Sequence, residues 1–326
     1  LIENFKTIRS LDLPCKRFNL FIGDTNTGKT NVLEALTLLS QNIIAPNRES
    51  PHQHELDRRI LRYGQLNDLF PGRDVTLPLR VSSSLMNVSG RYGEAGFTFE
   101  FTDHVNHQAI YTFQAAGIEA GPPVLTGNLE TKLRRYHYDP AVRFGPHWYT
   151  HLAPPDGSNL GAILMANTVL AEEVSEILAA KEVTIEVNPE TYGISLRHSR
   201  ARNVVVPIAF QNLSETLRRY LFMYVAIRTN QGSVLLFDEP EQNTYPFYTA
   251  HIGEIMALDG SNQYFLTTHN PYVLSAFVDK APADELQVLA THRKEGRTEV
   301  HVLSASELHE LMEFDAFLNI DRILNR

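Results

Sequence analysis

The sequence predicts an α/β fold in which a mixed sheet surrounds one central helix and an antiparallel β subdomain lies beside it. Three observations support this fold class. Residues 17–22 form a short apolar strand that runs through a glycine-bearing loop into a helical pattern. Residues 75–81, 97–102 and 109–114 alternate apolar and polar side chains, as antiparallel strands do. The last third holds three buried strands with helical stretches between them, which favours parallel pairing.

Each element has its own signal, taken in chain order. Residues 1–14 predict one or two strands before the strand at 17–22. Residues 30–42 predict a helix, because Val32, Leu33, Leu36 and Leu39 share one face. Residues 45–59 are polar and contain proline, so they predict a loop or irregular helix. The alternating strands are expected to turn at 90–96 and 103–108, and the glycine- and proline-rich residues 115–128 predict a lobe boundary.

The second half continues with helical and strand patterns. Residues 158–183 predict helix with Ser158 as cap, followed by a hairpin across residues 189–190. Residues 213–230 predict a helix capped by Ser214. Buried strands are expected within 233–241, 263–271 and 285–293. These patterns predict three parts: 1–120 with the loop and the antiparallel strands, 121–212 as an inserted helical lobe with a hairpin, and 213–326 as the C-terminal α/β part.

Composition narrows the class of protein. The net charge is −9, from 29 basic and 38 acidic residues, which argues against a surface that grips nucleic acid everywhere. Residues 197–203 form the clearest basic cluster, so local DNA contact stays open beside the alternative of a solvated hairpin end. Cys15 is the single cysteine, which excludes an internal disulfide and suits a reducing compartment. No run is apolar enough to span a bilayer, so we expect a cytoplasmic protein with no membrane contact.

The stretch GDTNTGKT matches the phosphate-binding pattern G-x-x-x-x-G-K-[ST]. In this pattern backbone N–H groups surround phosphates, the lysine reaches the β- and γ-phosphates, and the hydroxyl ligates Mg²⁺. The strand, loop and helix around it aim a helix N-terminus at an anion. Asn26 stands where many such loops have glycine, and asparagine tolerates a left-handed backbone. The predicted ATP-binding residues here are Gly23, Asp24, Thr25, Asn26, Thr27, Gly28, Lys29, Thr30 and Asn31.

Two later motifs complete the prediction. The apolar stretch VLLF ends in Asp238 and Glu239. A carboxylate at a strand end beside a phosphate loop can hold Mg²⁺, so Thr30 and Asp238 are the predicted metal residues. Glu239 suits the base that deprotonates an attacking water. His269 ends the next buried strand and can donate a hydrogen bond to a γ-phosphate.

The ordered motifs GDTNTGKT, NLSETLRR, LLFDEPE and TTHNP resemble those of ABC-type ATPases of the SMC-like and OLD-like branch, and IENFKTI and PPDGSNLGAIL also look like that branch. The resemblance implies a two-lobed head, and two ATPs sandwiched between two heads. It also implies that the helix beginning at Ser214 faces the ATP of the partner head. Family members usually carry L-S-x-G-T/Q there, whereas this chain has Glu215 and Thr216 and lacks the glycine. Gln65 is the nearest candidate for the family's glutamine loop.

These observations predict an ATP-binding and ATP-hydrolysing head that acts as an ATP-gated dimerisation switch. The resemblance places it in DNA maintenance or in defence against phage and plasmids, with a separate effector chain, for example a nuclease. No long heptad region and no appended nuclease domain are present in the sequence. Two alternatives stay open: an ATP sensor or scaffold with little turnover that holds an effector, and a P-loop kinase of small molecules. A GTPase is disfavoured, because no N-K-x-D-like motif follows the loop.

Overall fold

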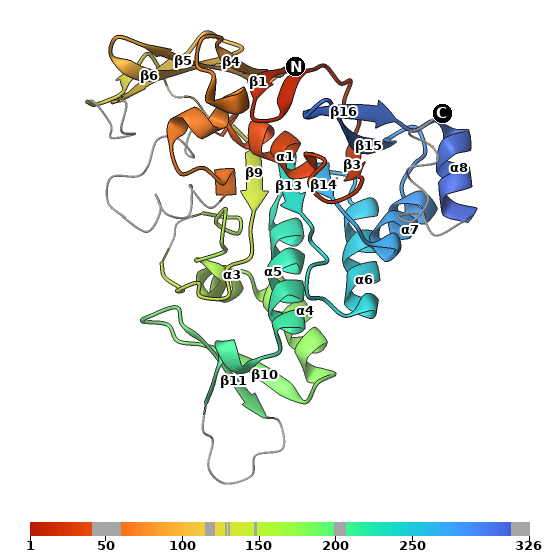
Figure 1. Cartoon of the computed structure of the whole chain (residues 1–326). Helices are drawn as coiled ribbons and strands as arrows, with labels where there is room; N and C mark the ends of the chain where they lie inside the picture. The colour runs from red at the N-terminus through yellow and green to blue at the C-terminus, as the bar shows by residue number, and fades with distance from the viewer. Residues whose placement is uncertain are drawn as a thin grey trace.

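The structure is a computed structural model, and it describes residues 1–40, 60–114, 121–127, 129, 131–146, 149–198 and 207–313. Figure 1 shows an antiparallel sheet at one end, a second sheet with helices in the middle, and a smaller helical part at the other end. The N-terminus lies at the antiparallel sheet. The last described helix lies beside the central layer.

The central sheet has six strands in the order β16–β15–β3–β14–β13–β9. Its strands from β15 to β9 are parallel, and β16 pairs with β15 in the antiparallel sense. This mixed sheet confirms the predicted fold class. Because parallel strands share one direction, the loops that follow β3, β9, β13 and β14 leave the sheet at the same edge. The strand bounds are β3 (Phe18–Ile22), β9 (Leu133–Tyr136), β13 (Val234–Asp238), β14 (Gln263–Thr267), β15 (Leu286–Lys294) and β16 (Arg297–Val302).

The antiparallel sheet has seven strands in the order β2–β1–β4–β5–β6–β7–β8. One prediction here was wrong: the turn expected at 90–96 is only the tip of a hairpin, and residues from Met86 onward are a strand. Gly90 lies within that strand because the Phe99 ring covers it, and an added Cβ would come 2.7 Å from Phe99 Cε1. The bounds are β1 (Ile2–Phe5), β2 (Ile8–Leu11), β4 (Leu79–Ser82), β5 (Met86–Gly93), β6 (Gly96–Asp103), β7 (Gln108–Phe113) and β8 (Val124–Leu125).

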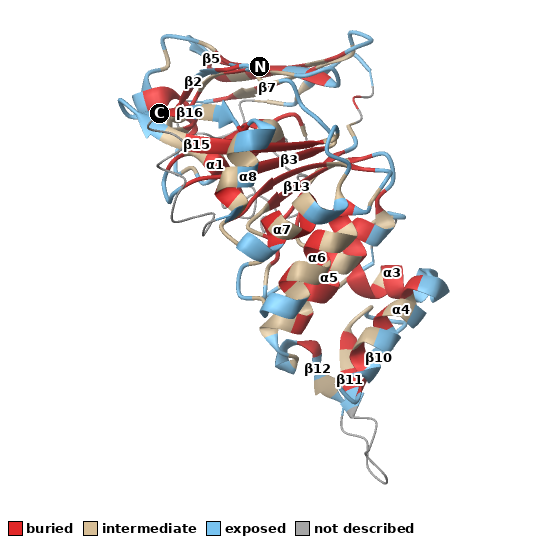
Figure 2. Cartoon of the chain, turned by 90° about the vertical axis from the view of Figure 1, so that its right-hand side faces the viewer, coloured by how far each residue is buried: buried red, intermediate tan, exposed pale blue. Residues whose placement is uncertain are grey.

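Helices cover both faces of the central sheet. Helix α1 lies between the two large sheets, where Val32 and Leu33 pack into one hydrophobic cluster with Phe5, Phe99 and Phe265. Successive side chains of a strand point to opposite faces, so Leu235 and Phe237 join a second cluster under the other helices. Figure 2 shows this buried layer in red along the central strands. The bounds are α1 (Lys29–Thr37), α5 (Glu215–Thr229), α6 (Pro246–Ala257), α7 (Pro271–Lys280) and α8 (Ala305–Glu313).

The smaller helical part differs from prediction in one detail. The stretch 158–183 is two helices, α3 (Leu160–Ala166) and α4 (Thr168–Ala179). Asn159 is the N-cap residue of α3, rather than Ser158, and Asn167 caps α4 by accepting a hydrogen bond from the Leu170 N–H. The predicted hairpin is confirmed as β10 (Val183–Val187) and β11 (Ile194–His198), which pair antiparallel, and β12 (Ile208–Ala209) extends it.

Short 3-10 helices complete the described elements: η2 (Leu66–Leu69), η3 (Pro71–Arg73) and η4 (Phe210–Asn212). The division into three parts stays a proposal. Strand β9 falls within the range proposed for the inserted lobe and is an edge strand of the central sheet. The predicted loop at 45–59 and most of the basic cluster at 197–203 lie outside the described residues. Among the described helices, none has the length and apolar character needed to cross a membrane.

Candidate functional site

The loop between β3 and α1 has a backbone that requires glycine at two positions. Gly23 has φ 144° and Gly28 has φ 102°. A Cβ on Gly23 would lie 2.3 Å from the Thr291 carbonyl oxygen, and one on Gly28 would lie 2.0 Å from Thr298 Oγ1. Asn26 adopts φ 61°, the left-handed conformation that the sequence predicted it would tolerate. The loop is therefore closely packed against the β15–β16 hairpin.

Threonine hydroxyls fix this loop to its neighbours. Thr27 Oγ1 lies 2.8 Å from Thr291 Oγ1, and Thr291 donates to the Ile22 carbonyl at 3.0 Å. Thr298 Oγ1 lies 3.0 Å from the Thr27 carbonyl oxygen and 2.6 Å from Thr7 Oγ1. These contacts join the loop to the turn between β1 and β2 and to strands β15 and β16. The loop conformation therefore depends on segments from both ends of the chain.

Lys29 is the first residue of α1, and its side chain folds back over the loop. Its ammonium donates to the carbonyl oxygens of Gly23 at 2.9 Å and Asp24 at 2.7 Å. Only 5% of the residue surface is exposed. Burial lowers the Lys29 pKa from its ordinary value, against the opposing effect of nearby carboxylates, first that of Glu239. The charge is thus held inside the loop.

Asp238 ends β13 with both carboxylate oxygens in contact. Oδ1 accepts from Thr30 Oγ1 at 3.0 Å and from Thr267 Oγ1 at 2.6 Å. Oδ2 lies 3.3 Å from a terminal nitrogen of Arg135 on β9. The structure therefore brings together Thr30 and Asp238, which the sequence predicted as a pair from separate halves of the chain.

Glu239 and His269 also meet. Glu239 Oε1 lies 3.0 Å from His269 Nε2. The Glu239 backbone has φ 48°, a conformation that costs energy for a non-glycine residue, and its N–H donates to Thr267 Oγ1 at 3.0 Å. The hydrogen bond from His269 lowers the Glu239 pKa, against the effect of burial, with further contributions from Lys29 and Arg62. Glu239 is therefore a carboxylate that can accept a proton.

Glu241 connects the loop after β13 to the loop after β14. Its Oε1 accepts from Thr268 Oγ1 at 2.6 Å and from the His269 N–H at 3.0 Å. Its Oε2 is buried and has no hydrogen-bond partner within the described part of the chain. Burial raises the Glu241 pKa. This carboxyl group fixes the backbone position of His269.

The start of α5 holds Ser214 as its N-cap, and Ser214 accepts from the Leu217 N–H at 3.4 Å. Glu215 Oε1 accepts from Arg219 Nε at 2.9 Å and from Asn243 Nδ2 at 3.2 Å. Its charge is paired within the chain, and the same contact ties the start of α5 to the loop after β13.

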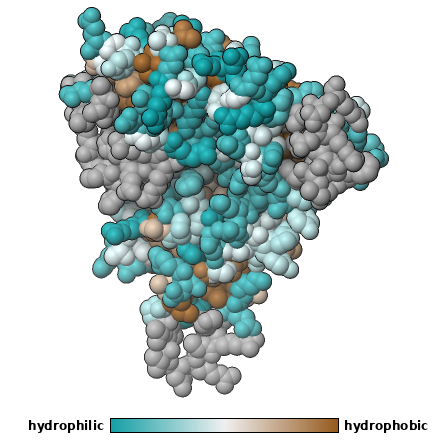
Figure 3. Space-filling model, viewed as in Figure 1, coloured by the Kyte–Doolittle hydropathy of each residue, from teal (hydrophilic) through white to brown (hydrophobic). Residues whose placement is uncertain are grey.

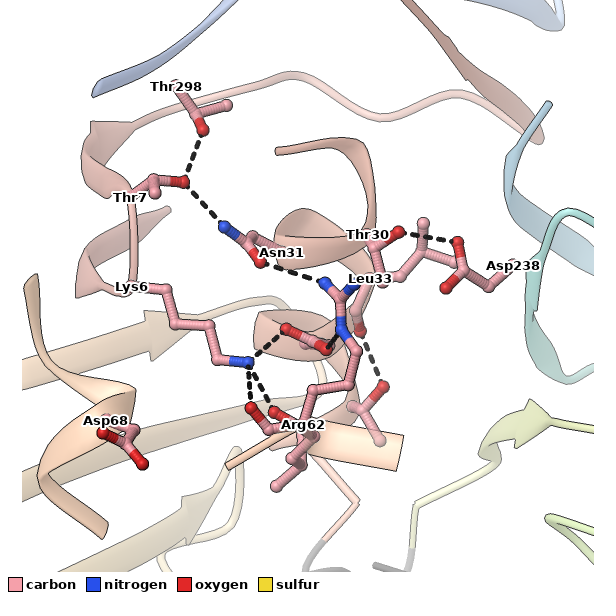
Figure 4. Close-up of polar contacts among 12 residues, drawn as sticks. Lys6, Thr7, Thr30, Asn31, Leu33, Arg62, Asp68, Asp238 and Thr298 are labelled. Atoms are coloured by element: carbon pink, nitrogen blue, oxygen red, sulfur yellow. Dashed lines mark hydrogen bonds and ion pairs between the residues drawn. The ribbon is translucent and has the colours of Figure 1, made fainter. Parts of the chain in front are cut away.

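A cluster of charges lies beneath the phosphate loop, as Figure 4 shows. Glu34 of α1 is fully buried and pairs with Lys6 Nζ at 2.7 Å and with Arg62 Nε at 2.5 Å. Asn31 bridges this cluster to Thr7, because it donates to Thr7 Oγ1 at 2.7 Å and accepts from Arg62 at 3.2 Å. The predicted residue Asn31 is therefore held on both sides.

Sequence reasoning missed two residues of β9 and the loop after it. Arg135 contacts Asp238, and His137 follows the end of β9, where its pKa is lowered chiefly by desolvation and then by Arg135. Parallel pairing of Tyr136 with Phe237 places His137 level with Asp238. The candidate Gln65 is an exposed residue at the start of η2, and its N–H donates to Asp68 at 2.8 Å. Its glutamine-loop role stays a prediction.

The donor set fits Mg²⁺ with a nucleotide. Thr30 and Asp238 offer hard oxygen ligands, and Mg²⁺ in such sites takes few protein ligands beside phosphate and water oxygens. Among the described residues no group of three or more His, Cys, Asp and Glu side chains is arranged to hold a metal by itself. A cavity of about 430 Å³ is lined by residues such as Leu36, Leu133 and Phe265. None of the predicted site residues lines it.

Comparisons with known proteins concern one stretch of the sequence and the fold of the chain. Residues 166–275 match the family model described as an AAA domain, putative AbiEii toxin, Type IV TA system. No curated protein sequence matches the chain. The crystal structure of an SMC head bound to the C-winged helix domain of ScpA has a TM-score of 0.55 at 11% identity, covering 95% of this chain and 98% of that chain.

A second structure is an SMC head domain with an extended coiled coil, bound to the C-terminal domain of ScpA and derived from Pyrococcus furiosus. Its TM-score is 0.51 at 11% identity, covering 96% of this chain and 97% of that chain. At this identity the likeness concerns the fold. The chain has the P-loop NTPase fold seen in SMC head domains, and residues 166–275 match a family model of an AAA domain.

Proposed function

We propose that this protein binds and hydrolyses ATP and works as an ATP-gated dimerisation switch. One observation carries the proposal: residues from distant parts of the sequence meet at one edge of the central sheet. Thr30 contacts Asp238 and Glu239 contacts His269, each at 3.0 Å, beside the loop that holds Lys29. A structural ion pair accounts for Glu239 and His269 alone. It does not account for their convergence with a glycine-dependent phosphate loop.

The chain's own residues divide the work. The N–H groups of residues 23–31 and the Lys29 ammonium bind the phosphates. Thr30 and Asp238 hold Mg²⁺, which neutralises phosphate charge when bound. Glu239 takes the proton of the attacking water, and His269, fixed through Glu241, donates to the γ-phosphate. The strained backbone of Glu239 and its N–H bond to Thr267 keep this base in one orientation.

Dimerisation is the second half of the proposal. The N-terminus of α5 presents N–H groups and the Ser214 hydroxyl, which suit an anion on a partner. With the Glu215 charge paired to Arg219, the missing signature glycine need not leave a repelling carboxylate at that place. Two copies related by a two-fold axis would then share two ATPs.

The comparisons support a proposal for the partner and the process. SMC heads in both similar structures bind a domain of ScpA, and we infer that this head likewise carries a separate effector protein, for example a nuclease. The matching family description names a toxin of a type IV system, which supports a role in defence or DNA maintenance in the cytoplasm. Figure 3 shows a mainly hydrophilic face around the upper part of the molecule.

Replacing Glu239 by Gln tests the hydrolysis step. The variant keeps the side-chain shape but cannot accept a proton, so ATP binding should persist while phosphate release falls by ~10²–10⁴. Steady-state phosphate release and calorimetric ATP binding are the two measurements. The matched control is Glu307→Gln, which also breaks a Glu–His pair: Glu307 of α8 lies 2.9 Å from His301 of β16, and this variant should keep parental turnover.

The same assay separates the alternatives. Phosphate release by Glu239→Gln at the parental rate would remove Glu239 from the role of base. Negligible release by the parental protein, together with tight ATP binding, would favour the sensor or scaffold. Transfer of the γ-phosphate to an added small molecule rather than to water would favour the kinase.

A further inference from the structure

Arg135 is a buried cation that contacts Asp238. It lies on the edge strand β9, and only 4% of its side chain is exposed. One terminal nitrogen lies 3.3 Å from Asp238 Oδ2, and the other donates to Thr37 Oγ1 of α1 at 3.4 Å. Its Nε is buried and has no hydrogen-bond partner among the residues that the structure describes. A guanidinium stays protonated even when desolvated, so a full positive charge is fixed beside the carboxylate.

Arg135 has Asp238 as its close anionic partner. In the described cluster around α1, the cations Lys6, Arg62 and Arg135 face the anions Glu34 and Asp238. Glu34 is already shared between Lys6 and Arg62, which leaves Asp238 as the close partner of Arg135. Arg135 is thus paired with Asp238, while Glu34 is shared by Lys6 and Arg62. A divalent cation approaching Asp238 meets a carboxylate whose charge is already compensated.

We propose that Arg135 makes Mg²⁺ binding at Asp238 conditional on the nucleotide: its fixed charge opposes the metal in the bare protein, and the phosphates of ATP outweigh that charge. This inference rests on the proposed function, because it takes Asp238 as a metal residue. It assigns Arg135 as a positioning residue that acts through Asp238, with no direct contact to substrate. It also gives a reason for a buried guanidinium with an unpaired Nε, which is costly for stability alone.

The test is calorimetric titration of Mg²⁺ alone into the nucleotide-free protein, and of ATP with and without Mg²⁺. Arg135→Gln should bind Mg²⁺ about tenfold or more tightly without nucleotide, since one unit charge close to a divalent ion is removed at low effective dielectric. The dependence of Mg²⁺ affinity on ATP should shrink by the same factor. Damage to the fold would weaken binding, so a gain in affinity is a result that damage does not produce.

Arg134→Gln is the matched control, because it removes the same charge one residue earlier on the same strand. Arg134 lies on the opposite face and contacts Asn230 and, at 2.8 Å, Ser233. It should leave Mg²⁺ affinity at the parental value, and Arg135→Lys, which keeps the charge, should stay close to it. If Arg135→Gln does not fold, Arg135→Met offers a long apolar side chain for the same measurement.

The outcomes separate the two proposals. Unchanged or weaker Mg²⁺ binding by a folded Arg135→Gln or Arg135→Met protein overturns the role of Arg135. So does tighter binding that survives an added Asp238→Asn, since the metal would then lie elsewhere. Absence of Mg²⁺-dependent ATP binding in the parental protein, by contrast, overturns the metal role of Asp238 and with it the proposed function.

Discussion

At two glycines, the absence of a Cβ atom allows the phosphate loop to adopt its conformation. At Gly28 a methyl group would lie 2.0 Å from Thr298 Oγ1 on β16, and at Gly23 the obstacle is a backbone carbonyl. A carbonyl cannot rotate away as a side chain can. The loop N–H groups are therefore presented by a backbone that few other residues permit, which is the preorganisation that anion binding needs.

Lys29→Ala tests nucleotide binding at this scale. Mg-ATP stabilises only the state that binds it, so the parental protein should melt at a higher temperature with Mg-ATP and the variant should show no shift. Lys29 also bonds two loop carbonyls, so each protein is compared with its own nucleotide-free melting temperature. The control is Lys280→Ala, which removes a lysine of α7 that pairs with Glu254 of α6 at 4.0 Å. This variant should keep the full shift. An unchanged shift in Lys29→Ala would exclude the loop as the ATP site.

Among elements, β9 shows where sequence reasoning stopped. The phosphate loop, the pair Asp238–Glu239 and His269 each follow a run of apolar side chains, so β3, β13 and β14 were recognisable and the residues after them could be assigned. Strand β9 has only four residues, LRRY, and two are arginines that buried strands rarely contain. Arg135 is buried only because Asp238 and Thr37 lie opposite it, and that pairing is a property of the folded sheet. Local pattern cannot reveal it.

The C-terminal helix α8 carries a testable electrostatic cap. Glu307 accepts from the Ser304 N–H and Oγ, each at 2.7 Å, and pairs with His301, which together lower its pKa to about 2. A lowered pKa in the folded state means that the carboxylate contributes stability above the ordinary value of 4.5, and that this contribution is lost as the pH falls toward 2. Glu307→Gln should therefore loosen α8 at neutral pH and much less in acid.

Hydrogen exchange of the α8 amides measures that effect locally, relative to the amides of α7. Faster exchange in Glu307→Gln at neutral pH, converging with the parental protein as Glu307 becomes protonated, is the expected pattern. Equal exchange in both proteins at neutral pH would show that the cap contributes nothing to this helix.

For the whole molecule, the site lies where two hydrophobic clusters meet across the central sheet. Leu236 and Phe265 belong to the cluster with α1, whereas Leu235, Phe237 and Leu266 belong to the cluster with α5, α6 and α7. The strands that end in Asp238 and Thr267 are held from both faces. The start of α5 is joined to the same edge through Glu215 and Asn243. A partner that contacts Ser214 would therefore act on an element already connected to the loop of Glu239.

The shared-site dimer predicts complementation between two inactive variants. Lys29→Ala removes phosphate binding on one chain, and Ser214→Arg blocks the α5 N-terminus that would face the partner's ATP. In a mixed dimer one site carries both defects, and the other combines intact Lys29 and Glu239 from one chain with intact Ser214 from its partner. Phosphate release should therefore be negligible for each variant alone and partly restored on mixing. If Ser214 served its own chain's site, or only capped α5, each chain would still carry its defect. No recovery, with subunit exchange confirmed by a labelled chain, would then exclude the shared site.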